Sequence, residues 1–295
     1  MTKIQGVYAA VPTPLTADAS KVDIENISKQ VDRLVDAGIH GVVTTGTTGE
    51  FPALTTEEHK SVIKGYVDAA KGRIPVVAGI GSNSTAHAIE MAQYSEKVGA
   101  VACMIVPPFY DPLSFKALYQ FYEDVCGSIN IPVMYYNLPG ATGVQLTADQ
   151  LRQLGEIKGF DYMKDTSGNA KEHADMLTNP SNKIKAFNGW DTLTFFAMAH
   201  GAEACVWGVA SVVPKECVEL WNALAVEKNL DKGRELWKYL WKVSDFLESV
   251  NYPAGIKAGC EIIGCPAGPV RRPTLPLEKE EVERFKNILD QRKYK

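Results

Sequence analysis

The sequence predicts a single (β/α)8 barrel, the TIM-barrel fold, with a C-terminal helical extension. Short β-rich runs alternate with amphipathic helical stretches from the start of the chain, an order typical of parallel strands joined by right-handed crossovers. Eight such units favour closure into a barrel, with an open doubly wound sheet as the alternative. The runs that we predict as strands span residues 6–14, 41–46, 74–81, 101–108, 131–137, 160–164, 184–188 and 203–209.

The stretches between these runs carry helical patterns and helix start signals. Apolar residues recur at helical spacing over residues 22–34. Thr55 and Glu58 form a capping box that opens a helix running to Tyr66, and Ser84 opens another. Each helix follows one strand and precedes the next, as a βα repeat requires.

Beyond the last predicted strand the chain continues as helices. Residues 214–247 and 277–292 are amphipathic, with a break at Asn229 in the first stretch. We therefore expect a barrel over residues 1–213 and C-terminal helices over residues 214–295, packed together as a single structural unit.

Composition excludes several classes of protein. The chain has 295 residues, of which 45% are hydrophobic and 22% charged, and a net charge of -4. This balance gives no basic footprint for nucleic acid. We find no run of about 18 apolar residues and no signal-peptide pattern, so we expect no membrane partner and a cytoplasmic location. The six cysteines show no CxxC spacing and are expected to be structural thiols.

Metal and cofactor signals are weak. None of the five histidines ends a predicted strand, and no HxH or HxxxH pair occurs, so no metal site is expected. Residues 79–81 (GIG) are only a fragment of a dinucleotide fingerprint, and no acidic residue stands where a ribose contact needs one. We expect no cofactor.

One lysine stands out by position. Active sites of such barrels are built at the carboxyl ends of the strands, and Lys164 alone among the lysines ends a predicted strand. Period-2 alternation predicts Phe160, Tyr162 and Lys164 on one side of that strand. Burial disfavours the charged form of an amine, and a neutral amine can attack a ketone to form an imine. The alternative is a lysine at the rim paired with Asp165.

Other strand ends offer polar groups for the same chemistry. The turn at residues 46–50 (GTTGE) combines two glycines with the hydroxyls of Thr47 and Thr48, which suits a carboxylate, although an ordinary βα turn is an equal alternative. Tyr110 and Tyr136 follow strands, and a phenol near an imine can serve as general acid and base. Buried tyrosines more often serve in packing. The remaining candidates at strand ends are Thr166, Gly189 and Trp207.

Across nearly its whole length the chain resembles the dihydrodipicolinate synthase / N-acetylneuraminate lyase family of pyruvate-handling Schiff-base enzymes. Several motifs carry this resemblance in the expected order. They are VPTPL near the N-terminus, GTTGE at 46–50, VPPFY at 106–110, YNLPGATG at 136–143, KDTSG at 164–168 and NGWD at 188–191.

The resemblance implies roles for five residues. Lys164 forms the imine with a 2-oxo acid, and Tyr136 relays protons to and from it. Thr47 and Thr48 bind the carboxylate and join the relay with Tyr110. In many relatives the residue matching Tyr110 reaches across a dimer interface, so a homotetramer made of two dimers is expected.

Two positions separate this chain from true dihydrodipicolinate synthases. Those enzymes carry an arginine where Gly140 and Ala141 stand, and that arginine grips the carboxylate of the aldehyde substrate; a methyl group cannot replace its bidentate hydrogen bonds. The lysine-feedback site of those enzymes also has a glutamate where His87 stands, although His59 and Asn83 match.

Other positions match the neuraminate lyases. Thr166, Ser167 and the NGWD segment ending in Asp191 are found in that subfamily, whereas Thr192 replaces its glutamate. We therefore expect a Schiff-base lyase or aldolase that cleaves or forms a C–C bond in a 2-keto-3-deoxy sugar acid, with pyruvate as product or donor. The alternatives are dihydrodipicolinate synthase proper, a sugar-acid dehydratase, and a catalytically silent barrel. The expected substrate contacts are Thr47, Thr48, Thr166, Gly189, Asp191 and Trp207.

Overall fold

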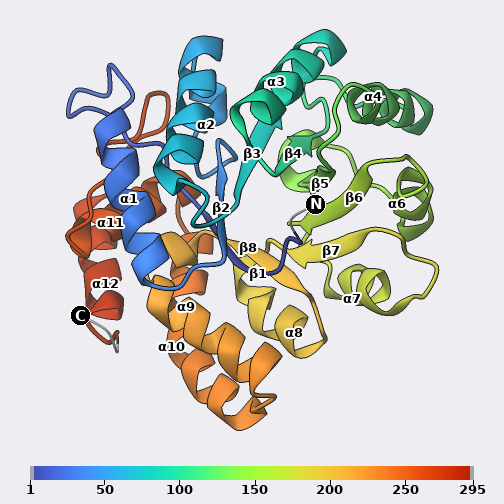
Figure 1. Ribbon diagram of the computed structural model, residues 1–295. Coiled ribbons are helices and arrows are strands. Elements are labelled where there is room, and N and C mark those ends of the chain that lie inside the picture. The colour runs from blue at the N-terminus through green and yellow to red at the C-terminus, as the bar shows by residue number, and fades with distance from the viewer. Residues whose placement is uncertain (1–2, 293–295) are drawn as a thin grey trace.

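The computed structural model describes residues 3–292, which form a closed barrel of parallel strands in sequence order (Figure 1). Each strand pairs with the next, and the last pairs with the first. The predicted barrel is confirmed and the doubly wound sheet is wrong. The strands are β1 (Gly6–Ala10), β2 (Gly41–Thr44), β3 (Val76–Gly81), β4 (Ala102–Val106), β5 (Val133–Asn137), β6 (Phe160–Asp165), β7 (Lys185–Asn188) and β8 (Ala204–Trp207).

Helices surround the barrel and begin largely where the sequence signals stand. Thr55 forms the predicted capping box with Glu58, Ser84 caps the next helix, and Asn229 caps the longest. The helices are α1 (Ile24–Asp36), α2 (Thr56–Ala70), α3 (Thr85–Val98), α4 (Phe115–Gly127), α5 (Pro139–Thr142), α6 (Ala148–Leu154), α7 (Ala170–Thr178), α8 (Thr194–Ala199), α9 (Pro214–Trp221), α10 (Leu230–Glu248), α11 (Tyr252–Ile262) and α12 (Lys279–Leu289).

Alternate side chains of each strand fill the barrel or pack against the helices. In β8, Ala204 and Val206 belong to the cluster inside the barrel, whereas Cys205 and Trp207 belong to the layer between barrel and helices. The inner cluster also holds large side chains such as Tyr162, so the barrel interior is a packed core. The space for a ligand is therefore at the ends of the strands.

One strand departs from simple alternation. Phe160 was predicted to share a side with Tyr162 and Lys164, and this is wrong. The pairing of β5 with β6 shifts so that Asp161 is an extra residue, with Val133 opposite Phe160 and Met134 opposite Tyr162. The bulge turns Phe160 outward into the layer of helix-facing side chains. Tyr162 still faces inward, and Lys164 lines the pocket at the strand ends.

The helix α11 was not predicted. Its segment contains Pro253, Gly255 and Gly259, which disfavour a helix on local propensity. The glycines permit close packing, because a Cβ at Gly255 would lie 2.8 Å from Leu247 and one at Gly259 would lie 2.8 Å from Phe285. Tertiary contact therefore overrides propensity here.

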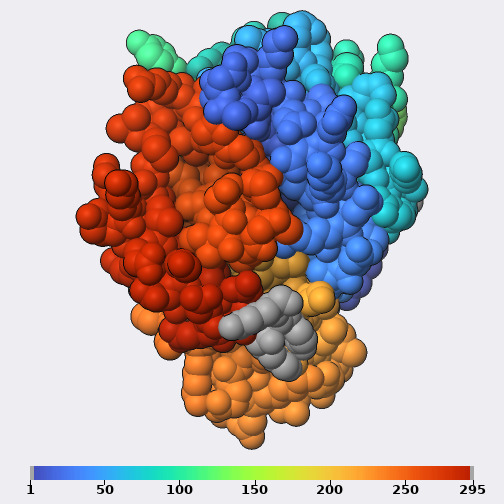
Figure 2. All heavy atoms as spheres, turned by 90° about the vertical axis from the view of Figure 1, so that its left-hand side faces the viewer, coloured from blue at the N-terminus to red at the C-terminus, as the bar shows by residue number. Residues whose placement is uncertain are grey.

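The C-terminal segment closes against the start of the chain. Figure 2 shows the red C-terminal region beside the blue N-terminal region. Leu15 N donates to Ala267 O at 3.0 Å, and Asn26 Nδ2 donates to Pro266 O at 2.8 Å. These contacts tie residues that are about 240 positions apart to one another. The predicted division at residue 213 stays a prediction, and its residues 1, 2 and 293–295 lie outside the described range.

Three observations concern features that residues 3–292 do not show. The cysteines there form no disulfide, and all except Cys265 are buried. No helix in this range is long and apolar enough to cross a membrane. No group of three or more histidine, cysteine, aspartate or glutamate side chains there is arranged to hold a metal ion.

Candidate active site

A pocket of about 230 Å³ lies at the carboxyl ends of the strands. Most of its walls come from strand ends, and the rest from α10 and α11. It brings together seven of the nine predicted site residues, which are Thr47, Thr48, Tyr136, Lys164, Thr166, Gly189 and Asp191. Tyr110 and Trp207 do not line it.

Lys164 and Tyr136 form the centre of the pocket. They are register partners on β6 and β5, so their side chains leave the barrel wall side by side. Lys164 Nζ lies 4.1 Å from the centroid of the Tyr136 ring, and both residues are buried. Gly189 makes room for the lysine, because a Cβ there would lie 2.4 Å from Lys164 Cε. An amine and a phenol thus share one buried site.

The turn after β2 supplies a hydroxyl to this pair. Thr47 Oγ1 lies 3.1 Å from Tyr136 OH, and either oxygen can be the donor. The turn is held in an unusual conformation, with φ of 51° at Thr45 and 54° at Glu50. Gly49 is required within it, since a Cβ would lie 2.8 Å from the backbone of Thr45. A short 3-10 turn follows, before α2 begins. The backbone conformation of the 46–50 turn therefore places the Thr47 hydroxyl in the pocket.

An acidic residue lies on another wall of the pocket. Asp191 is buried, and Tyr252 OH donates a 2.5 Å hydrogen bond to its Oδ2. Burial raises the pKa of Asp191 to about 7, with the hydrogen bond from Tyr252 opposing the rise and the charge of Glu248 adding to it. The Asp191 carboxyl therefore changes charge near neutral pH.

Three pocket residues come from the C-terminal helices and were not predicted. They are Tyr252 at the start of α11 and Leu247 and Glu248 at the end of α10. Glu248 accepts hydrogen bonds from Thr192 N at 2.8 Å and Thr192 Oγ1 at 2.9 Å. Burial raises the pKa of Glu248 as well. A search for site residues at the carboxyl ends of predicted strands misses these residues, because they lie beyond the last strand.

Trp207 was predicted to contact the substrate, but it does not line the pocket. Its side chain is fully buried on the outer side of β8, where its ring lies 6.1 Å from that of Trp237. Alternation along the strand turns it outward, and its neighbours Val206 and Gly208 line the pocket instead.

Tyr110 lies on the surface of this chain. It is 89% exposed, in the loop after β4, and its backbone N–H donates to Asn83 Oδ1 at 3.2 Å. The single chain does not bring Tyr110 to the pocket. Its proposed role needs a second copy of the chain.

The pocket is poor in positive charge. Gly140 and Ala141 are exposed residues of α5 and do not line the pocket, while Leu138 from the same segment does. Among the described residues that line the pocket, the ionisable side chains other than tyrosine are Lys164, Asp191 and Glu248. One cation therefore faces two carboxyl groups.

Comparison with known proteins gives consistent results. The dihydrodipicolinate synthetase family matches residues 3–292. The chain is 34% identical over 286 residues to a 4-hydroxy-tetrahydrodipicolinate synthase of Methanocaldococcus jannaschii, covering 97% of each protein. It is 35% identical to the enzyme of that name from Archaeoglobus fulgidus, again covering 97% of each. A solved dihydrodipicolinate synthase of Acinetobacter baumannii, complexed with pyruvate, superposes with a TM-score of 0.92 at 31% identity over 98% of both chains.

Proposed function

Since this chain belongs to the dihydrodipicolinate synthetase family of class I aldolase-type enzymes, we propose that it is a lyase acting on 2-keto-3-deoxy sugar acids through an imine on Lys164. Pyruvate is the product of cleavage or the donor in the reverse direction. Thr47 and Thr48, which lie in the 46–50 turn and line the pocket, bind the carboxylate of the 2-oxo acid.

The observation that carries the choice of substrate is the charge of the pocket. Lys164 is bonded to C2 of the 2-oxo acid in the imine, which leaves Asp191 and Glu248 as the ionisable groups other than tyrosine that the described lining residues offer to the rest of the substrate. A second carboxylate on the substrate would be desolvated there without a cation to pair with. The hydroxyls of a sugar chain instead donate hydrogen bonds to carboxylate oxygens. A neutral polyhydroxyl acceptor is therefore the better complement.

The proposed reaction proceeds in four steps. The Lys164 amine attacks C2 of the 2-oxo acid, and the carbonyl oxygen leaves as water with two protons, which gives a protonated imine once a proton is taken up. Tyr136 takes the proton of the C4 hydroxyl, the C3–C4 bond breaks, and its electron pair flows into the imine to form an enamine. The aldehyde leaves. Protonation of the enamine at C3 and hydrolysis by water release pyruvate and restore Lys164.

The geometry of Tyr136 supports this assignment. Its phenol lies against Lys164 and within hydrogen-bond distance of Thr47, so a proton taken by Tyr136 has a hydroxyl to pass to. We infer that Tyr110 of a second copy extends this relay, since the exposed Tyr110 of each chain has no contact with its own pocket. The assembly that we propose is a homotetramer built from dimers.

The second candidate is 4-hydroxy-tetrahydrodipicolinate synthase itself. It is favoured by relatives of that name, which are about one-third identical over almost the full chain. It uses the same imine with pyruvate and differs in the acceptor, an aldehyde that carries a carboxylate. A sugar-acid dehydratase, which would lose a hydroxyl from the same imine, is a variant of the first candidate.

Reduction with borohydride in the presence of pyruvate tests the proposal. We expect one stable pyruvate adduct, mapped to Lys164 by mass spectrometry, and none in the Lys164→Ala variant. Lys185→Ala is the matched control, because Lys185 begins β7 at the opposite end of the barrel and is exposed. It should keep the adduct. Absence of an adduct in the wild-type protein would point to a silent barrel, and an adduct on another lysine would refute the role of Lys164.

A further inference from the structure

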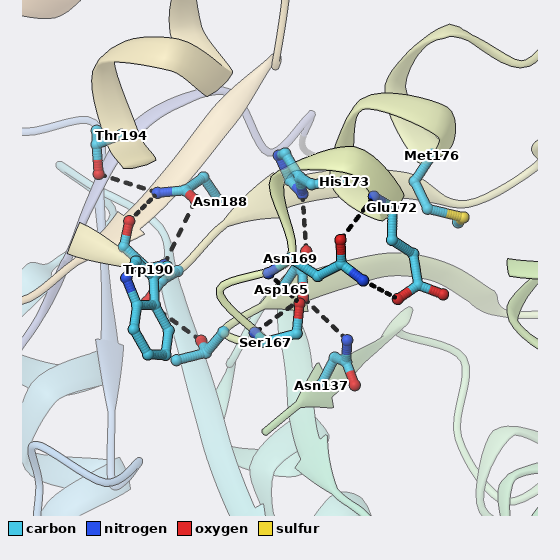
Figure 3. A network of polar contacts seen from close by, with 12 residues as sticks. Asn137, Asp165, Ser167, Asn169, Glu172, His173, Met176, Asn188, Trp190 and Thr194 are labelled. Carbon is cyan, nitrogen blue, oxygen red and sulfur yellow. Dashed lines mark hydrogen bonds and ion pairs between the residues drawn. The ribbon is translucent and has the colours of Figure 1, made fainter. Parts of the chain in front are cut away.

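The residues directly after Tyr136 and Lys164 are tied to each other. Asn137 and Asp165 are the next register pair along β5 and β6. Asn137 Nδ2 donates to Asp165 Oδ1 at 2.9 Å, and both side chains are buried (Figure 3). Alternation directs this pair away from the pocket, while the preceding pair lines it. The bond therefore joins the two strands one residue beyond the reacting groups.

A histidine on α7 holds the same carboxylate from the other side. His173 Nδ1 lies 3.1 Å from Asp165 Oδ2, and both residues are at least nine-tenths buried. A carboxylate only accepts hydrogen bonds, so the proton of the imidazole is on Nδ1 in the neutral ring. His173 Nε2 has no hydrogen-bond partner among the described residues. The contact to Asp165 is thus the polar interaction that fixes this ring.

Backbone hydrogen bonds extend the network to residues next to Lys164. Thr166 N donates to Asn137 O at 2.8 Å, and Gly189 N donates to Asp165 O at 2.8 Å. Ser167 N donates to Asp165 Oδ1 at 3.1 Å and is the third donor to this carboxylate, after Asn137 and His173. Gly189 is the residue whose Cα lies against the Lys164 side chain. A shift of Asp165 is therefore transmitted to both the backbone and the packing of Lys164.

We propose that His173, Asp165 and Asn137 form a clamp that sets the placement of Lys164 relative to Tyr136, with His173 as a positioning residue that does not touch the substrate. This inference rests on the proposed imine chemistry. Imine formation needs the amine at C2 of the bound 2-oxo acid, and proton transfer needs the phenol beside it. The clamp holds the strand ends that carry these two groups.

The physical reason lies in burial. If the side chain of residue 173 cannot donate, Asp165 Oδ2 is left buried without a partner, which is unfavourable. The carboxylate is then expected to turn toward another donor and to release Asn137. The strand ends can shift by fractions of an ångström while the barrel stays folded. Small misplacements of reacting groups cost up to about 10²-fold in rate.

The test uses two reactions of the full-length enzyme with pyruvate alone. One is the rate of adduct formation with borohydride, and the other is the exchange of the pyruvate methyl protons for deuterium, followed by NMR. Exchange requires the imine to lose a C3 proton, with the electron pair moving to the imine nitrogen, and then to gain a deuteron from solvent. Both rates are measured against pyruvate concentration.

The expected results separate positioning from folding and from binding. His173→Leu should lower the saturating rates by about 10- to 100-fold, with less than about a threefold change in the half-saturating pyruvate concentration. His173→Asn places an amide N–H near the position of Nδ1 and should restore rates to within about threefold of wild type. His200→Leu is the matched control, because His173 and His200 line one cavity beside α7, and His200 makes no side-chain hydrogen bond to the clamp. It should behave as wild type.

Several outcomes would overturn the clamp. His173→Leu at wild-type rates would do so, as would an equal loss in His173→Asn, since then the hydrogen bond would not be the cause. If His173→Leu does not fold, Asn137→Ala removes the bond between the strands from the other side, and wild-type rates there would refute the clamp. Failure of the wild-type protein to form any adduct would instead refute the proposed function.

Discussion

At the scale of single residues, burial disfavours the ionised form of Asp191. Its carboxyl lies inside the pocket, bonded to Tyr252 and close to Glu248. Burial raises its pKa from 3.8 to about 7, whereas its unfolded value stays near 3.8. Between these values the folded protein keeps a proton that the unfolded chain has released. The group therefore favours folding most at low pH, and this contribution declines as pH rises toward 7.

We predict that Asp191→Asn removes this decline. Relative to wild type, the free energy of unfolding of the variant should rise from pH 4 to pH 7 by about 1–4 kcal/mol, since one pKa unit corresponds to about 1.4 kcal/mol, and then stay level. Urea unfolding of both proteins across this range measures the difference, in which the titration of groups that do not interact with Asp191 cancels. A difference that does not depend on pH would contradict the raised pKa.

At the scale of single residues, sequence reasoning succeeded where position along the fold decided the outcome. Lys164, Tyr136 and Thr47 end strands or begin the turns after them, and the pocket contains all three. It failed where the outcome depended on which side of a strand a side chain faces. Trp207 ends β8 but faces the helices. Phe160 is turned outward by a bulge that no local sequence pattern predicts.

At the scale of elements, α11 connects the C-terminal helices to the active-site turn. Lys257 Nζ lies 2.7 Å from Glu50 Oε1 and donates to Pro269 O at 2.7 Å, and both charged residues are buried. Glu50 Oε2 accepts from Arg271 N at 2.8 Å. Glu50 is the last residue of the turn that carries Thr47. One carboxylate thus joins this turn to the C-terminal segment.

We predict that Lys257→Met destabilises the protein by about 3–5 kcal/mol, because it leaves the Glu50 charge buried without its cation. The double variant Lys257→Met with Glu50→Gln should recover a large part of this loss, since the unpaired charge is then gone. Urea unfolding of the two single variants and the double variant forms the cycle that measures the coupling. A loss below about 1 kcal/mol in Lys257→Met would show that the pair contributes little.

Most helices and strands could be predicted from the sequence, but the contact between α11 and the 46–50 turn could not. The strands and the helices between them follow from hydrophobic period and capping residues, which act locally. The helix α11 depends on Gly255 and Gly259 fitting under Leu247 and Phe285, a contact between segments that only the folded chain brings together. Tyr252 and Glu248 also line the pocket because of packing between segments that are distant in the sequence. The pocket wall made by the C-terminal helices could therefore not be predicted from one sequence.

At the scale of the whole molecule, both the barrel and the C-terminal helices contribute side chains to the proposed reaction. The strand ends hold the amine, the phenol and the hydroxyls that act on the 2-oxo acid, and α10 and α11 add carboxyl and phenol groups to the same pocket. The first set is suited to any member of the family that uses an imine. In the proposed reaction the second set faces the acceptor, while Gly140 and Ala141 lie outside the pocket.

We therefore predict that the enzyme prefers 2-keto-3-deoxy sugar acids to the pair of pyruvate and aspartate semialdehyde. The semialdehyde carries a carboxylate, and the lack of a cationic partner for such a group typically costs about 2–5 kcal/mol, or tens- to thousands-fold in kcat/KM. Several sugar acids and the semialdehyde are compared in one panel, together with Ala141→Arg. That variant returns a guanidinium to the segment and should raise kcat/KM for the semialdehyde alone.

The same panel tests regulation by lysine. His87 Nδ1 lies 3.1 Å from Ser82 Oγ, and its Nε2 lies 3.4 Å from Thr56 Oγ1. In the lysine-feedback site that the family resemblance implies, this imidazole takes the place of the glutamate that would pair with an ammonium group. Millimolar lysine should therefore leave all rates unchanged, and His87→Glu is the variant in which inhibition is expected if the rest of that site is intact. If the semialdehyde is the best substrate and lysine inhibits the wild-type enzyme, the sugar-acid proposal is wrong and the synthase activity takes its place.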